Sequence, residues 1–156
     1  MNTTTTNDSS QTALASELGV SPRRVRQLIA EGILPAARAG AYDVQRCLER
    51  HELYLARHDG AAWEAFEDRL VRDARRAERL LAAALRPAAG WPQLRTASVA
   101  TQRLFSDLSF MTRCRSKTPA ERTLFLELWR EREDRALGLL VARACELPGH
   151  RAIASE

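Results

Sequence analysis

Apolar side chains recur every three or four residues along most of the chain, which is the spacing of one face of an α-helix. Six segments carry this pattern, separated by short polar or glycine-containing stretches. We expect helices over residues 12–18, 22–31, 44–57, 61–85, 96–115 and 119–145. The pattern therefore predicts an all-α protein, in which the stretch after the second helix forms either a small β-wing or a plain loop.

Capping residues, proline and glycine mark the helix ends. Ser21 followed by Pro22 is a favoured N-cap and first-turn pair, because proline lacks an N–H that would go unpaired there. Residues 118–121 (TPAE) have the form of a capping box. Residues 87–92 (PAAGWP) form a clear break between helices.

These signals divide the chain into four parts. Residues 1–10 are polar with nothing to bury, so we expect a disordered tail. Residues 11–58 form a small N-terminal domain and residues 61–147 a helical region, with the boundary near residues 58–61. Residues 148–156 are expected to be a flexible tail.

Cysteine usage and hydropathy argue against a disulfide-bonded, secreted or membrane-spanning protein, and the charge is mildly basic. The formal net charge is +4, and of the 24 basic residues only Lys117 is lysine. Arginine suits DNA recognition because it pairs bidentately with guanine edges and phosphates, although a GC-rich genome also enriches it. Three widely spaced cysteines without a CxxC predict reduced thiols in a cytoplasmic protein. The longest uncharged apolar run, residues 80–85, is too short for a membrane span, and the N-terminus is not a signal peptide.

The first two helices have the spacing of a helix-turn-helix. Ala15 is small where the helices must cross, and Gly19 can adopt the positive φ of a tight turn. The second helix would bury Val25, Leu28 and Ile29. Val25 and Ile29 would pin it to the first helix, leaving its arginines and glutamine outward for major-groove reading. The residues predicted to contact DNA are Ser21, Pro22, Arg23, Arg24, Arg26, Gln27 and Arg38.

Residues 34–43 have the length of a small β-wing. Gly40 would lie in its turn, and Arg38 would reach a neighbouring phosphate or the minor groove. A plain loop of the same length fits the sequence as well.

Three segments together resemble the MerR-like winged-helix superfamily: residues 18–28 (LGVSPRRVRQL), residues 31–35 (EGILP), and Tyr42-Asp43 leading into a helix. Within that superfamily the arrangement looks most like the small terminase subunit of lambda-like phages. The resemblance covers the first third of the chain, and its motifs are specific for the domain rather than for terminases. The middle helix is shorter and less heptad-like than a long coiled-coil seam, a departure that leaves the mode of dimerisation open.

The resemblance implies a phage or prophage protein acting in the cytoplasm of a bacterial host cell. Such a subunit binds double-stranded packaging DNA as a homodimer or higher homo-oligomer, and recruits a large subunit with ATPase and nuclease activity. The alternative is a MerR-like or excisionase-like transcription regulator with a helical dimerisation module. More large apolar side chains lie beyond residue 100 than two helices can cover, which also predicts at least a dimer.

The sequence motifs that come nearest to catalytic or metal-binding signatures are incomplete. His51-Glu52 begins like HExxH, but the fifth residue is Leu55. Cys47, His51 and His58 could share a helix face, yet a zinc site needs a fourth ligand and none is apparent. Nucleotide-binding and nucleophile motifs are missing from the sequence. We therefore expect no enzyme activity, no cofactor and no metal.

Overall fold

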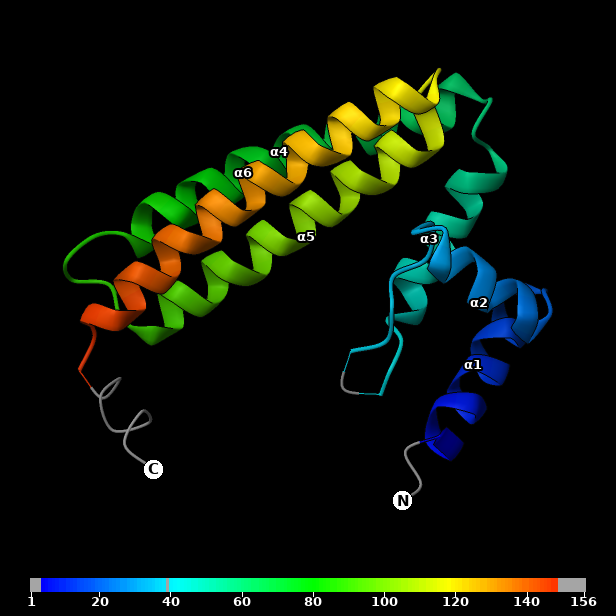
Figure 1. The fold of residues 1–156 in the computed structure, drawn as a ribbon, viewed down its shortest axis with the longest axis horizontal. Helices are drawn as coiled ribbons and strands as arrows, with labels where there is room; N and C mark the ends of the chain where they lie inside the picture. The colour runs from blue at the N-terminus through cyan, green and yellow to red at the C-terminus, as the bar shows by residue number, and fades with distance from the viewer. Residues whose placement is uncertain (1–3, 39, 149–156) are drawn as a thin grey trace. The chain divides into compact units, whose positions relative to one another are not determined.

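The computed structural model describes residues 4–38 and 40–148, and it folds them into six helices joined by short loops (Figure 1). The helices are α1 (Thr4–Leu18), α2 (Pro22–Ala30), α3 (Val44–Leu55), α4 (Gly60–Ala84), α5 (Trp91–Arg115) and α6 (Pro119–Glu146). The described residues contain no strand, so the predicted all-α class is confirmed.

The chain divides into two compact units. The first comprises Met1–Trp63 and Arg113–Arg115, and the second comprises Glu64–Thr112 and Ser116–Glu156. The division falls a few residues after the boundary that the sequence suggests near residues 58–61.

A small apolar core holds the first unit together. Leu14 and Ala15 from α1 are buried, and they share this core with Val25 and Leu28 from α2 and Cys47 from α3. Val25 and Leu28 are three residues apart and so lie on one face of α2, as the sequence predicts. Ile29 differs from the prediction, because it lies at the edge of this face and is only half-buried.

The first helix begins earlier than the sequence predicts. Residues 4–10 belong to α1 rather than to a disordered tail, and only residues 1–3 of the predicted tail lie outside the described part. Adding a turn to a helix already nucleated by packed residues gains one hydrogen bond per residue fixed, so weak helix formers can extend it. The predicted C-terminal tail, apart from Pro148, also lies outside the described residues.

The segment between α2 and α3 contains a turn rather than a two-stranded wing. Arg38 and Ala41 exchange backbone hydrogen bonds of 2.8 and 3.0 Å, which makes one isolated antiparallel bridge. Gly40 has a φ of 80°, as a tight two-residue connection requires. Ile33 and Leu34, in the predicted irregular stretch, are buried and attach this segment to the core.

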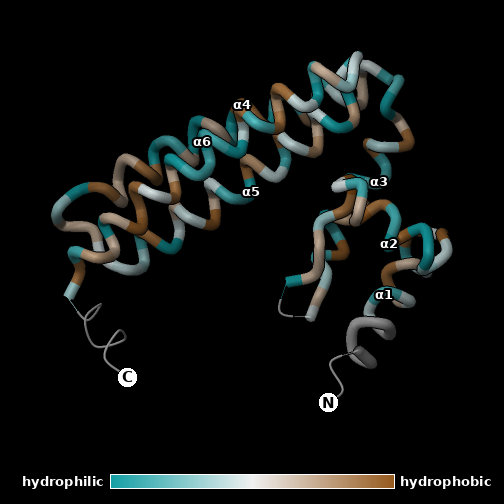
Figure 2. The backbone as a smooth tube through the Cα atoms, in the orientation of Figure 1, coloured by the Kyte–Doolittle hydropathy of each residue, from teal (hydrophilic) through white to brown (hydrophobic). Residues whose placement is uncertain are grey.

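The second unit is built from three long helices that run side by side, α4, α5 and α6 (Figure 1). Figure 2 shows hydrophobic and hydrophilic residues following one another at short intervals along each of them. Phe66 of α4 meets Phe110 of α5 edge to face, with ring centroids 5.8 Å apart. Near the other end of the helices, Ala84, Leu94 and Leu140 share a buried cluster.

One helical face and one helix start differ from the predictions. In α3 the buried residues are Cys47, Arg50 and Leu53, whereas Leu55 is exposed. Apolar spacing predicts a buried face formed by Val44, Cys47, Leu48, His51 and Leu55. The observed buried face shares only Cys47 with this set, so it is turned from the predicted one. Helix α5 begins at Trp91 instead of residue 96, since the backbone N–H of Gly90 donates to the Gln93 side chain at 3.1 Å and proline is tolerated in a first turn.

Candidate nucleic-acid interface

A three-residue turn connects α1 to α2. The N–H of Val20 donates to the carbonyl of Ala15 at 3.0 Å, and the N–H of Gly19 donates to the carbonyl of Ser16 at 3.2 Å. Gly19 has a φ of 66°, a conformation that costs a residue with a Cβ free energy. This turn closes α1 and lets α2 start within three residues, as a helix-turn-helix requires.

The N-terminus of α2 is capped as the sequence predicts. The Ser21 hydroxyl accepts the backbone N–H of Arg24 at 3.2 Å, and Pro22 occupies the first turn. A helix N-terminus carries partial positive charge, so it favours a nearby phosphate. Ser21 is exposed and Pro22 half-buried, which leaves this end of α2 at the surface.

The outward face of α2 carries the predicted reading residues. Arg23, Arg26 and Gln27 are exposed, while Val25 and Leu28 on the opposite side are fully buried. Arginine can donate to both acceptors of guanine, and glutamine can pair with adenine in the major groove. The buried side holds the backbone of α2 in place, and the exposed side leaves the ends of these three side chains accessible to a ligand.

Arg24 is held by the protein itself. Its Nη2 donates to the Tyr54 hydroxyl at 3.4 Å, and its Nη1 lies 3.7 Å from a Glu31 carboxylate oxygen. Tyr54 belongs to α3, so this hydrogen bond joins α2 to α3 across 30 residues of sequence. The structure therefore gives Arg24 a positioning contact that the sequence pattern did not reveal.

Arg38 is exposed beside the Gly40 turn. The same segment is tied to α1, because Gln11 Nε2 donates to the Tyr42 hydroxyl at 3.2 Å. Arg38 thus stands on an anchored turn rather than on a paired strand.

Two titratable groups of α3, the buried Cys47 and the half-buried His51, have shifted pKa values. Burial raises the pKa of the Cys47 thiol to about 11, and Asp43 adds to this shift. A thiol with so high a pKa is protonated near neutral pH and behaves as a core side chain. Burial also lowers the pKa of His51, and the Arg24 guanidinium lowers it further, against the opposing effect of Glu52.

The lowered pKa of His51 predicts a pH-dependent stability. The folded state favours neutral His51, so its contribution is fully present above the unfolded pKa of about 6.5 and is lost as the pH falls through the folded value. We expect urea unfolding to show this loss between about pH 7 and pH 5. The variant His51→Gln should show a smaller loss over this range, and His58→Gln, at an exposed position, should behave like the parent. Equal pH dependence in all three proteins would contradict the assignment.

No family model, curated protein or solved structure matches the chain. Across the six helices described, none is long and apolar enough to cross a membrane. Within residues 4–38 and 40–148, no three His, Cys, Asp or Glu side chains come together as a metal site would require.

Proposed function

We propose that this protein binds double-stranded DNA in a sequence-specific way, with α2 in the major groove. The observation that carries the proposal is the two-sided character of α2. Val25 and Leu28 fix one side in the core, and Arg23, Arg26 and Gln27 project from the other. The Arg38 turn then acts as the wing and contacts the phosphate backbone.

The proposed biological role is that of a small terminase subunit, which recognises viral packaging DNA and recruits a large ATPase-nuclease subunit. The resemblance of residues 18–43 to that family supports this role. The surface of α6 supports it too, because Leu124 is 64% exposed and Val141 is 63% exposed, with Phe125 and Leu139 also at the surface. Exposed apolar residues of this kind suit assembly with other chains.

The DNA contact is tested by titrating binding on cognate and random duplexes over a range of salt concentrations. Removing a base-reading side chain, as in Arg23→Ala or Gln27→Ala, should cost about 1–3 kcal/mol on the cognate duplex and relax the preference at one base pair. Removing a phosphate contact, as in Arg38→Ala, should weaken binding to both duplexes alike and lower the salt slope by about one unit.

The outcomes separate reading from positioning. If all three variants bind both duplexes as tightly as the parent, this face does not touch DNA and the proposal is wrong. Specific DNA binding could also be confirmed for a transcription regulator. If the protein controls transcription from its site and no large ATPase-nuclease associates with it, it is a regulator and the terminase role is wrong.

Assembly is tested independently of DNA. Light scattering at micromolar concentration should show at least a dimer, because the exposed apolar residues of α6 would otherwise face water. The double variant Leu124→Ser/Val141→Ser should shift the protein towards the monomer, whereas Arg122→Ser at an exposed polar position should not. A monomeric parent contradicts this part of the proposal.

A further inference from the structure

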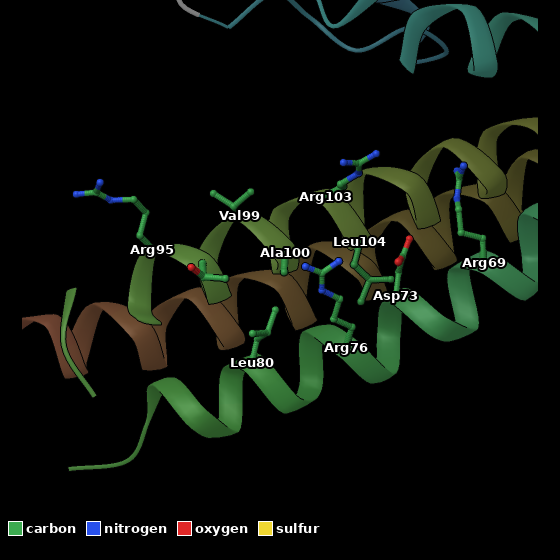
Figure 3. A pocket seen from close by; sticks show the side chains of 10 residues that line it. Arg69, Asp73, Arg76, Leu80, Arg95, Val99, Ala100, Arg103 and Leu104 are labelled. Carbon is green, nitrogen blue, oxygen red and sulfur yellow. The ribbon is translucent and has the colours of Figure 1, made fainter. Parts of the chain in front are cut away.

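A groove of about 530 Å³ runs between α4 and α5 within the second unit (Figure 3). Four arginines line it, two from each helix, and its apolar lining includes Leu80, Val99 and Leu104. Its charged residues are Arg69, Asp73, Arg76, Arg95 and Arg103. The lining thus combines four cationic side chains and one anionic side chain with apolar groups.

One wall of the groove is a regular stripe on α5. Arg95, Val99 and Arg103 are four residues apart, so they lie on one face of the helix and span about 12 Å. Figure 3 shows Val99 between the two arginines, with Arg76 extending from α4 towards α5. Val99 is 54% exposed, although it is a β-branched apolar residue in the middle of a helix.

The α5 wall of the groove belongs to a strongly basic segment. Residues 85–117 hold six basic residues and one acidic residue, Asp107, which is buried. The rest of the chain holds 18 basic and 19 acidic residues. Of the six basic residues in this segment, Arg95 and Arg103 line the groove, so an anionic ligand is the complement of its lining.

We infer that this groove binds an acidic amphipathic helix of a partner protein. Carboxylates of such a helix would pair with the arginines that line the groove, since a guanidinium donates to a carboxylate in a planar, bidentate way. Apolar side chains one turn apart would enter between Arg95 and Arg103 and cover Val99. The assignment does not depend on the DNA contact of α2.

The other occupants fit less well. A DNA backbone offers phosphates to the arginines but no apolar group for Val99 and Leu80. A second copy of this chain offers α6, whose exposed charges between Arg130 and Arg135 are of both signs. A helix with acidic residues on one face and leucines on the other complements both the arginines and the apolar residues of the groove.

The probe is a fluorescein-labelled synthetic helix of about 18 residues, with leucines at helical spacing and glutamates elsewhere. Fluorescence anisotropy with the full chain should show saturable binding that weakens with salt. The variants Arg95→Glu and Val99→Asp should each weaken it by about tenfold or more. Arg75→Glu makes the same charge change at an exposed position of α4 outside the groove, and it should leave binding unchanged.

Four results of the binding measurements, and one of the self-association measurement, would overturn the inference. The first four are no binding by the parent, equal binding of a scrambled peptide that lacks the leucine stripe, equal loss in the Arg75→Glu control, and a loss of DNA affinity in Arg95→Glu as large as in Arg23→Ala. Loss of self-association in Arg95→Glu would likewise put a second copy in the groove in place of a partner. Thermal melts of all variants keep these results interpretable, because the substituted side chains are exposed.

Discussion

Replacing Leu28 with alanine should lower the free energy of unfolding by about 2–5 kcal/mol. Leu28 is 0% exposed in the last turn of α2. Its carbonyl accepts the N–H groups of Ile33 at 2.9 Å and Leu34 at 3.2 Å, so the chain leaves the helix and re-enters the core at this point. Truncating the side chain leaves a cavity beneath the helix that is proposed to read DNA.

Urea unfolding followed by circular dichroism measures this effect. The matched control is Leu55→Ala, which removes the same atoms from a side chain that is 63% exposed and should change stability by less than about 0.5 kcal/mol. Near-equal losses in the two variants would mean that Leu28 does not anchor α2. At temperatures where the variant stays folded, Leu28→Ala should weaken cognate and random duplexes together, since it removes no base contact.

Helical periodicity predicts the parts of the fold that local sequence controls. In α4 it predicts a stripe of Trp63, Phe66, Leu70, Ala74, Ala77 and Leu81. The first three and Ala77 are buried, whereas Ala74 is exposed and Leu81 is half-buried. In α3 it fails, because apolar spacing cannot reveal that an arginine will be buried in place of an apolar residue. Arg50 is 3% exposed, and its aliphatic stem can cover apolar surface in the core.

The exposed side chains of the candidate interface follow from the same periodicity, because burying Val25 and Leu28 turns Arg23 and Gln27 outward. The contacts that orient the interface could not be predicted. Tyr54 is 30 residues from Arg24 in sequence, and no local pattern indicates that the two side chains meet.

The basic groove was also missed, for a related reason. Its walls come from α4 and α5, and each wall alone looks like a solvated helix face. The excess of arginine in residues 85–117 was a visible signal, but it gains meaning only once the partner helix is known.

The largest effect on function is expected from removing the outward face of α2 altogether. In the triple variant Arg23→Ala/Arg26→Ala/Gln27→Ala, each lost base contact should cost about 1–3 kcal/mol on the cognate duplex, so most of the preference over random DNA should disappear. Stability should change little, because all three side chains are exposed and neighbouring Val25 and Leu28 remain in place.

Competition between cognate and random duplexes at several salt concentrations measures the loss of preference directly. The matched control is Arg75→Ala/Arg79→Ala, which removes the same two positive charges from exposed positions of α4 and should keep the preference intact. If the control loses as much cognate affinity as the triple variant, net charge rather than the α2 face governs binding. If the triple variant keeps its preference, sequence is read elsewhere on the protein. Base reading by α2 requires that only the triple variant loses its preference for the cognate duplex. It also requires that this variant, which keeps Arg38, still binds any duplex in a salt-dependent way.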